Sequence, residues 1–577
     1  MHNATVLPTR AASARGVRLR SDAAIASWIG ISTILFVLVP ILVLLYVSFR
    51  SEPPGAPGGV FTIKNWLDMA TKVRNREALF NTISISSVAT LISMVTGTAF
   101  AWLFARTDMP ARRALFPLLI LPMTVPVLLL TIAWIGLASP DAGFINLLWK
   151  QLFGFNHSLL NIYSFWGIVA VLVFRFTPYV LLLLYATFTA MDVSMEEASR
   201  VLGGSPTRTF IRITLPVLAP SLFSAGLLSF VLIAEQFTVV TLLGGPIGYT
   251  TLPYAIFRAT QYFPTRPNLA ATYGIVLLVV MMGGMSLYHR LLRVSGRFVT
   301  VTGRGYRARL VDIGRWRYPA LLACLTYLGL AVVLPYLALV VGSFLKYFTP
   351  HVRTDLLTLD NYRAVLSLSN ARVVTGFKNT LLLSLVGASV TLLLTAVLAH
   401  ITVRSKGPLG RLLSTAATLP LSVPPLSLAI GLLWMFLYLP IGIYGTIWVL
   451  FFAYYIRFMG QSTRIISSNI LQISPELEDA ARVLGASRMR SFRDITLPLI
   501  RRAAVSAWIL LLILMSLEIS VTLFLSTGKT QTLAVVLWHA ANMGEFPEAM
   551  ALSVVSATVI FVLVGIGQRA FGLLSSI

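Results

Sequence analysis

Twelve long apolar runs dominate the chain and limit the folds open to it. Each is close to the ~20 residues that a helix needs to cross the hydrocarbon core of a bilayer. None shows the alternation of apolar and polar residues typical of a membrane β-strand. The sequence therefore predicts an all-α, multi-pass membrane protein with about 12 transmembrane helices, near residues 26–48, 82–104, 114–137, 164–188, 213–236, 269–291, 318–343, 379–402, 411–437, 441–463, 500–524 and 549–571.

The composition agrees with a membrane location. Of the 577 residues, 57% are hydrophobic and 11% are charged, whereas about a quarter of a soluble domain is charged. The net charge of +25 would suggest nucleic-acid binding in a soluble protein. Here the basic residues lie between the apolar runs, so membrane topology and anionic lipid headgroups explain them, and no nucleic-acid partner is expected. Cys324 is the single cysteine, which excludes a disulfide framework; no metal site and no cofactor are expected.

The basic residues also predict the orientation of the chain. They are concentrated in the tail 1–25, in the loops that follow Arg106 and Arg404, and in the linker 293–317. All of these lie on one side of the membrane if both termini are cytoplasmic. The loop 49–81 is also basic, but acidic residues accompany it. The apolar run after the tail has no small-residue cleavage site, so we expect an uncleaved first helix.

An internal repeat divides the chain into two halves. Arg106, Pro110, Pro122 and Pro126 recur 298 residues later as Arg404, Pro408, Pro420 and Pro424, and Ile213-Thr214-Leu215-Pro216 recurs 282 residues later. The change of offset places 16 extra residues in the first half, most simply in the external loop around Ser139–Tyr163. Six spans separate equivalent segments, so the repeat is parallel. We expect a first half at 26–292, a cytoplasmic linker at 293–317 and a second half at 318–577, with prolines that kink the third and ninth spans.

The loop between the fourth and fifth spans of each half carries the strongest motif. Both copies begin with acids, continue with small residues and end in Val-Leu-Gly; they read Glu196-Glu197-Ala198-Ser199-Arg200-Val201-Leu202-Gly203 and Glu478-Asp479-Ala480-Ala481-Arg482-Val483-Leu484-Gly485. Ser194 and Ser474 can cap short helices, whose dipoles favour the acids, and the glycines can end them in a left-handed conformation. The alanines leave one face thin enough for another protein to approach. An ordinary cytoplasmic loop is the alternative, and the recurrence of the motif in matching loops disfavours it.

These loops, at 194–216 and 474–498, resemble the EAA loop of ABC importer permeases: Glu-Ala-Ala, three residues, Gly, nine residues, Ile-x-Leu-Pro. Ser199 and Asp479 depart from that pattern. The resemblance extends over nearly the whole chain, which looks most like the fused ferric-iron, thiamine and phosphonate permeases of the bacterial inner membrane. It implies the type I permease fold and a docking helix that seats an ATPase subunit. The implied coupling residues are Glu196, Glu197, Ala198, Gly203, Glu478, Asp479, Ala480 and Gly485.

The ATPase is expected to be a separate protein. Gly528-Lys529-Thr530 looks like the end of a Walker A loop, but that motif needs a glycine where Leu523 stands. The chain is thus expected to be a transport subunit rather than an enzyme. By the resemblance, its partners are two copies of a cytoplasmic ABC ATPase and a periplasmic or lipid-anchored solute-binding protein. Ferric iron is the first choice of substrate, with thiamine, phosphonate and polyamine open; a 12-helix ion-coupled secondary transporter is the alternative class.

Four charged residues fall within or near the ends of apolar runs. Arg175 and Arg457 are related by the 282 offset, and Glu235 and Glu518 by 283. A charge at the bilayer centre costs roughly 2.5 to 3.5 kcal/mol on insertion scales, so such residues usually pair or face a wet cavity. We expect Arg175 near Glu235 and Arg457 near Glu518, flanking the solute pathway. The alternative is that each arginine snorkels or bonds carbonyls at a helix end.

Overall fold

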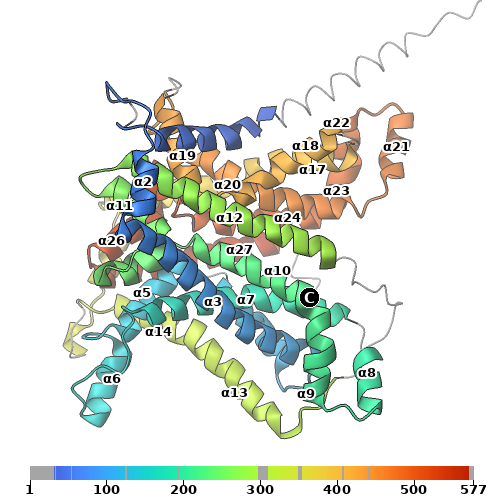
Figure 1. Ribbon diagram of the computed structural model, residues 1–577, viewed down its shortest axis with the longest axis horizontal. Coiled ribbons are helices and arrows are strands. Elements are labelled where there is room, and N and C mark those ends of the chain that lie inside the picture. The colour runs from blue at the N-terminus through green and yellow to red at the C-terminus, as the bar shows by residue number, and fades with distance from the viewer. Residues whose placement is uncertain are drawn as a thin grey trace, which may run out of the picture. The chain divides into compact units, whose positions relative to one another are not determined.

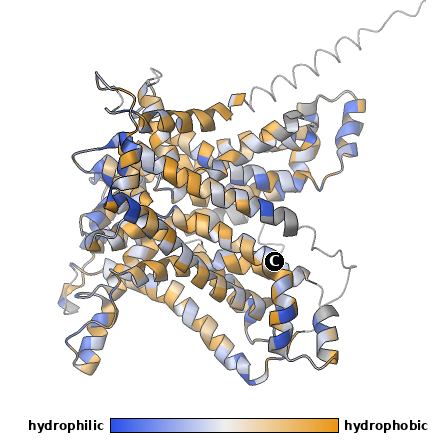
Figure 2. Cartoon of the chain, in the orientation of Figure 1, coloured by the Kyte–Doolittle hydropathy of each residue, from blue (hydrophilic) through white to orange (hydrophobic). Residues whose placement is uncertain are grey.

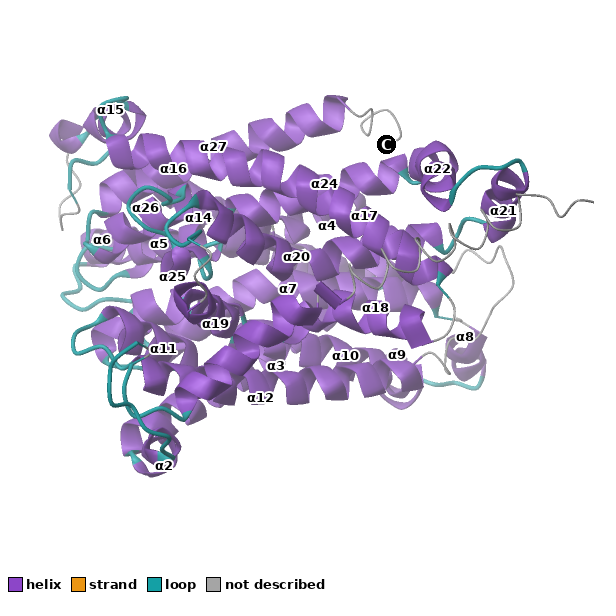
Figure 3. Cartoon of the chain, turned by 90° about the horizontal axis from the view of Figure 1, so that it is seen from above, coloured by secondary structure: helices purple, strands orange, loops and turns teal. Residues whose placement is uncertain are grey.

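The computed structural model describes residues 31–295 and 310–570, apart from 33, 54, 124–125, 192–193, 348–353, 406–407 and 439–441. Helices make up nearly all of the regular structure in these ranges, and isolated bridges take the place of strands (Figure 3). The long helices are predominantly hydrophobic (Figure 2). The all-α, polytopic fold predicted from the apolar runs is therefore confirmed.

Seven stretches of helix are long and apolar enough to cross a membrane by themselves. Several are formed by two helices or by a helix and a short turn. They are α3 (Val73–Arg106), α7 (Phe165–Ala190), α10 (Leu215–Ala234) with the turn before it, α12 (Pro267–Ser295), α13 (Arg317–Leu328) with α14 (Leu334–Ser343), α16 (Ala371–Leu381) with α17 (Ala388–Arg404), and α27 (Phe546–Ala570).

Three further spans are bent rather than straight. The pair α4 (Arg112–Ile120) and α5 (Val127–Ala138) bends by 96°, and the pair α18 (Pro408–Thr418) and α19 (Pro425–Tyr438) bends by 105°. Proline removes a helical hydrogen bond and clashes with the preceding turn, so the third and ninth spans break at their repeated prolines, as predicted. The runs 114–137 and 411–437 are thus not continuous helices.

A third bend, of 81°, precedes α24 (Arg501–Ser516). The predicted eleventh span, 500–524, is therefore too long, because its helix already ends at Ser516. The remaining two predicted spans correspond to the apolar helix Ile34–Ser48, with residues 26–30 outside the described part of the chain, and to α20 (Ile447–Ile470). Each of the twelve apolar runs thus corresponds to a helix or a bent pair of helices.

The chain forms two compact units that differ from its two sequence halves. The α20 unit comprises Met1–Val43, Phe377–Thr532 and Ile560–Ile577, and the α3 unit comprises Leu44–Gly376 and Leu533–Val559. The beginning of the second sequence half therefore belongs to the α3 unit. There the Tyr327 hydroxyl of α13 donates to the carbonyl of Phe174 in α7, at 2.8 Å. The half boundaries at 292 and 318 remain a prediction about the repeat.

Each unit has its own core of buried side chains between its helices. In the α3 unit, α3 and α7 pack around buried Phe100, Leu181 and Phe188. In the α20 unit, α17, α20 and α24 pack around small or branched residues such as Ala399 and Ile466. Small residues let membrane helices approach closely. These cores hold the ends of the long helices, from which the two short helices of the repeated loop project.

Candidate functional site: two docking helices

The repeated loops form α8 (Ser194–Val201) in the α3 unit and α21 (Pro475–Val483) in the α20 unit. Each stands off from the ends of the long helices of its own unit (Figure 1). Acidic residues occupy the first turn of both, where the positive end of the helix dipole favours them. The Ser474 side chain accepts a hydrogen bond from the amide of Glu476, at 3.3 Å, which confirms the predicted cap. The side chain of Ser194 lies outside the described structure.

Both helices end at the predicted glycines. The φ angle is +80° at Gly203 and +92° at Gly485, a left-handed conformation that side chains disfavour. The amide of Gly204 then bonds the carbonyl of Ser199 at 2.8 Å, and the amide of Ala486 bonds that of Ala481 at 3.0 Å. This closing bond stops the helix and turns the chain back. The helix ends are therefore fixed in the same way in both units.

One glutamate of each docking helix points into its own unit. Glu196 and Glu478 are 5% and 7% exposed. The Thr214 hydroxyl donates to Glu196 Oε1 at 2.7 Å, and the Thr496 hydroxyl donates to Glu478 Oε1 at the same distance. A buried carboxylate needs such donors. These glutamates thus tie the docking helix to the start of the next long helix instead of presenting their charge to solvent.

An arginine at the end of α3 or α17 holds the chain at the start of each docking helix. Arg106 Nη2 donates to the carbonyl of Met191 at 3.2 Å, and Arg404 Nη2 donates to that of Ile473 at 3.1 Å. Both carbonyls lie just ahead of a docking helix. In the sequence, Arg106 and Arg404 indicate only the orientation of the chain and the register of the repeat. Their recurrence together with the motif was the signal that they position the docking helices.

The second copy has an additional clamp. Glu478 also accepts hydrogen bonds from Arg404 Nε and, at its other oxygen, from His400 Nε2, each at 3.1 Å. Burial by itself raises the pKa of Glu478, but the hydrogen bonds from Arg404, Thr496 and His400 outweigh burial and lower this pKa below its usual value. In the first half Trp102 stands at the position of His400 and packs edge-on against Phe210. Glu478 therefore has a guanidinium and an imidazole as partners in addition to the threonine hydroxyl that both glutamates share.

The tip of each docking helix exposes two large apolar side chains. Val201 and Leu202 are each 87% exposed, and Val483 and Leu484 are 81% and 90% exposed. Apolar side chains gathered at equivalent exposed positions mark a surface that another protein covers. The Val-Leu recurrence is visible in the sequence, but these residues are not among the predicted coupling residues.

The other motif residues surround this tip. Ala198, Asp479 and Ala480 are exposed, and Glu197 is half-buried. Asp479 pairs with Arg482 of its own helix at 3.1 Å. The alanines thus leave an accessible face beside the apolar tip, as the sequence analysis expected.

The expected pair of membrane charges is present in the α20 unit. Arg457 Nε lies 2.7 Å from Glu518 Oε2, and Glu518 is 6% exposed. The other oxygen of Glu518 accepts a hydrogen bond from the amide of Val521 at 2.9 Å. Glu518 thus has partners at both oxygens, as a buried carboxylate requires.

The corresponding pair is not formed in the α3 unit, where our expectation was wrong. The guanidinium of Arg175 lies over the rings of Phe176 and Tyr179, at 5.7 and 5.4 Å, and its Nε and Nη1 have no hydrogen-bond partner. The register explains the difference. Glu235 directly follows the end of α10, whereas α24 ends two residues before Glu518, so the two acids leave their helices at different points.

Comparison with known families identifies the class of this two-unit helical protein. Residues 93–300 and 391–575 match the family model described as "Binding-protein-dependent transport system inner membrane component". The chain belongs to this family and carries its domain twice. It is a fused, multi-pass inner-membrane permease of the type I ABC importer class, which sets aside the secondary transporter considered from the sequence.

Similar proteins include permeases with different named substrates. The Fe(3+)-transport system permease protein FbpB 2 of Haemophilus influenzae is 24% identical, over 93% of this chain and 97% of its own. The spermidine/putrescine transport system permease protein PotB of Escherichia coli is 29% identical, over 46% of this chain and 96% of its own. Among solved structures, a bacterial alginate ABC transporter in complex with its alginate-bound periplasmic protein shows 18% identity and a TM-score of 0.37, over 44% of this chain and 92% of the matched chain.

Proposed function

We propose that this chain forms the solute pathway of an ATP-driven importer and that α8 and α21 each seat one copy of a cytoplasmic ATPase subunit. The observation that carries the proposal is the repeated construction of the docking helices. In both, a buried glutamate bonds a threonine inside the unit, while a Val-Leu pair is exposed at the tip. Both termini are then cytoplasmic, on the side of the docking helices.

The contacts suggest how ATP-driven movement reaches the membrane. An ATPase that moves a docking helix pulls on Glu196 or Glu478, and through the threonine hydroxyl on the start of the next long helix. The carbonyl bonded by Arg106 or Arg404 transmits the same movement to the preceding helices. Rigid attachment at two points favours movement of whole helices, as alternating access requires. Hydrolysis takes place on the separate ATPase, so this chain is a transport subunit and not an enzyme.

We propose ferric iron as the solute, delivered by a periplasmic or lipid-anchored binding protein. The support is that Fe(3+) permeases match nearly the full fused length, whereas the phosphonate and polyamine relatives match about half of this chain. Thiamine, phosphonate and polyamine are the competing solutes. Uptake of radiolabelled ferric iron by cells that express the complete transporter, with each competitor in excess, tests this assignment. Uptake of a competitor without any iron uptake would overturn it.

Copurification of the ATPase tests the docking assignment. Leu202→Ser with Leu484→Ser removes one exposed apolar side chain from each tip and changes stability by only about 0.5 kcal/mol. We expect the purified chain to lose its ATPase and the cells to lose uptake. Leu368→Ser is the control, since Leu368 is 89% exposed but lies far along the chain from both tips. Retention of the ATPase by the double variant, with normal uptake, would contradict the proposal.

A further inference from the structure

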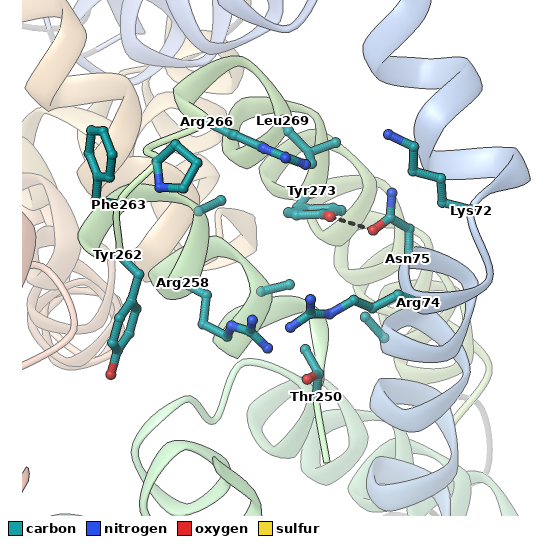
Figure 4. A pocket seen from close by; sticks show the side chains of 14 residues that line it. Lys72, Arg74, Asn75, Thr250, Arg258, Tyr262, Phe263, Arg266, Leu269 and Tyr273 are labelled. Carbon is teal, nitrogen blue, oxygen red and sulfur yellow. Dashed lines mark hydrogen bonds between the residues drawn. The ribbon is translucent and has the colours of Figure 1, made fainter. Parts of the chain in front are cut away.

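A basic pocket lies at the end of the α3 unit remote from α8. Its volume is about 300 Å³, and it opens between the start of α3, α11 (Leu252–Gln261) and the start of α12 (Figure 4). The 34 residues of α3 span about 50 Å at 1.5 Å per residue, and Arg106 at their far end holds the α8 loop. The pocket therefore lies on the opposite side from the docking helix.

Four cations line this pocket, and an acid balances only one of them among the described residues. Lys72, Arg74, Arg258 and Arg266 contribute to its wall, and no aspartate or glutamate does. Lys72 bonds Asp68 at 2.6 Å. The three arginines form no ion pair in the described part of the chain, and Figure 4 shows Arg74 and Arg258 pointing toward one another across the pocket. Several like charges around one cavity repel each other unless an anion lies between them.

The floor of the pocket is polar and already ordered. The buried Tyr273 hydroxyl donates to Asn75 Oδ1 at 2.6 Å (Figure 4). The Asn75 amide in turn donates to the carbonyl of Asp68 at 2.8 Å. These bonds fix the floor without using any of the three arginine guanidinium groups, which remain available to a ligand.

The second half shows that the shared fold does not require these charges. At the position of Lys72 the second half has Asn370, and at that of Arg258, aligned on Leu252 and Leu533, it has His539. At the position of Arg266, aligned on Pro267 and Pro547, it has Phe546, and the first turn of the helix that follows carries the acidic Glu548. Only Arg372, the counterpart of Arg74, keeps its charge. The cluster of four cations is therefore specific to the first half and calls for a separate explanation.

We propose that this pocket binds a phosphate group, carried either by a phospholipid of the outer leaflet or by a small soluble phosphate ester. Guanidinium groups bind phosphate oxygens in pairs, with charge-assisted hydrogen bonds. The volume suits a small headgroup. Phe263 and Tyr262 at the rim are 96% and 49% exposed, and tyrosine is enriched at the membrane interface. The site is distinct from the docking helices and does not depend on the identity of the transported solute.

The test uses the purified full chain. Arg258→Gln with Arg266→Gln removes two of the unpaired cations, and Arg363→Gln with Arg372→Gln is the matched control in the second half. In one arm, native mass spectrometry measures retention of phosphatidylglycerol against phosphatidylcholine. In the other, thermal unfolding is titrated with glycerol 3-phosphate at constant ionic strength, with chloride as the reference anion.

We expect the pocket variant to lose about tenfold in affinity in one of the two arms, while the control behaves like the parent chain. The responding arm identifies lipid or soluble ester as the source of the phosphate. If neither probe distinguishes the pocket variant from the control, the proposal is wrong. It is equally wrong if phosphate binding is unchanged and the variant instead loses association with the binding protein, which would make the pocket a protein-docking surface.

Discussion

The Thr496 hydroxyl donates a 2.7 Å hydrogen bond to Glu478, and 282 residues earlier the Thr214 hydroxyl donates a bond of equal length to Glu196. In each unit this bond joins the docking helix to the start of the next long helix. It is a short, direct connection between the surface proposed to bind the ATPase and the membrane segments that must move.

Removing the threonine hydroxyl should loosen the docking helix. Thr496→Val leaves a buried carboxylate oxygen with one donor fewer, which costs about 1.5 to 3 kcal/mol locally. Hydrogen exchange at the amides of α21 should become faster, while exchange in α20 stays unchanged. Thr187→Val is the control, because the exposed Thr187 hydroxyl bonds only a carbonyl of its own helix. Equal exchange in both variants would contradict the role assigned to Thr496.

Neutralising the two buried glutamates should have unequal effects. Glu478→Gln replaces the carboxylate that pairs with Arg404 and His400 by a neutral amide. The side chains of these two partners are only 18% and 10% exposed. Breaking such a buried pair costs about 3 to 5 kcal/mol. For Glu196→Gln we expect a smaller loss, near 1 to 2 kcal/mol, because its bond comes from a neutral hydroxyl. Thermal unfolding in detergent measures the loss of stability in both variants. A larger fall in the unfolding temperature for Glu196→Gln than for Glu478→Gln would be inconsistent with this structure.

Acid should weaken the attachment of α21. The pKa of Glu478 is lowered in the folded state, so its ionised form stabilises the fold at neutral pH. That contribution is present above the unfolded pKa of about 4.3 and is lost as the pH falls through the lower folded pKa. Limited proteolysis of the α21 loop between pH 6 and pH 3 should show this loss in the parent chain. Glu478→Gln should be sensitive already at pH 6 and should change less with pH.

Replacing Arg457 should cost more stability than replacing Arg175. Arg457→Gln leaves the buried Glu518 without its ionic partner, and we expect a loss of about 3 kcal/mol or more. Arg175→Gln removes two aromatic contacts and no ion pair, so about 1 kcal/mol is expected. Thermal unfolding of both variants, with a double-mutant cycle through Glu518→Gln, checks the difference. A cycle with no coupling energy between Arg457 and Glu518 would refute the pairing.

Gly431 should be intolerant of any side chain. A Cβ atom added there would clash with the backbone carbonyl of Pro40, so Gly431→Ala should push the first apolar helix away from α19. Gly283→Ala meets no atom within 4 Å and should be neutral or slightly stabilising, since alanine favours helix by about 1 kcal/mol. Protease accessibility of the Ile34–Ser48 helix compares the two. Similar accessibility in both would show that this close approach is unimportant.

Much of this architecture follows from local features of the sequence. Apolar runs long enough to span a bilayer form helices because a helix satisfies all of its backbone hydrogen bonds within one segment. The repeated prolines mark two bends because proline removes a helical hydrogen bond and clashes with the preceding turn, although Pro178 and Pro220 stand inside the continuous helices α7 and α10. Gly203 and Gly485 end the docking helices because the left-handed conformation depends on the residue itself.

Other features depend on what lies nearby in space. The sequence by itself determined the helices, their repeat and the position of the docking motif, since these rest on composition and short-range geometry. Only the tertiary structure decided that Arg404 and His400 meet Glu478 and that α13 belongs to the unit of α3. It also decided that Glu518 pairs with Arg457, whereas Arg175 contacts aromatic rings and no acid among the described residues. Side chains distant in the sequence meet only through the packing of whole helices, and a shift of a residue or two where a helix ends redirects a side chain without altering the apolar pattern.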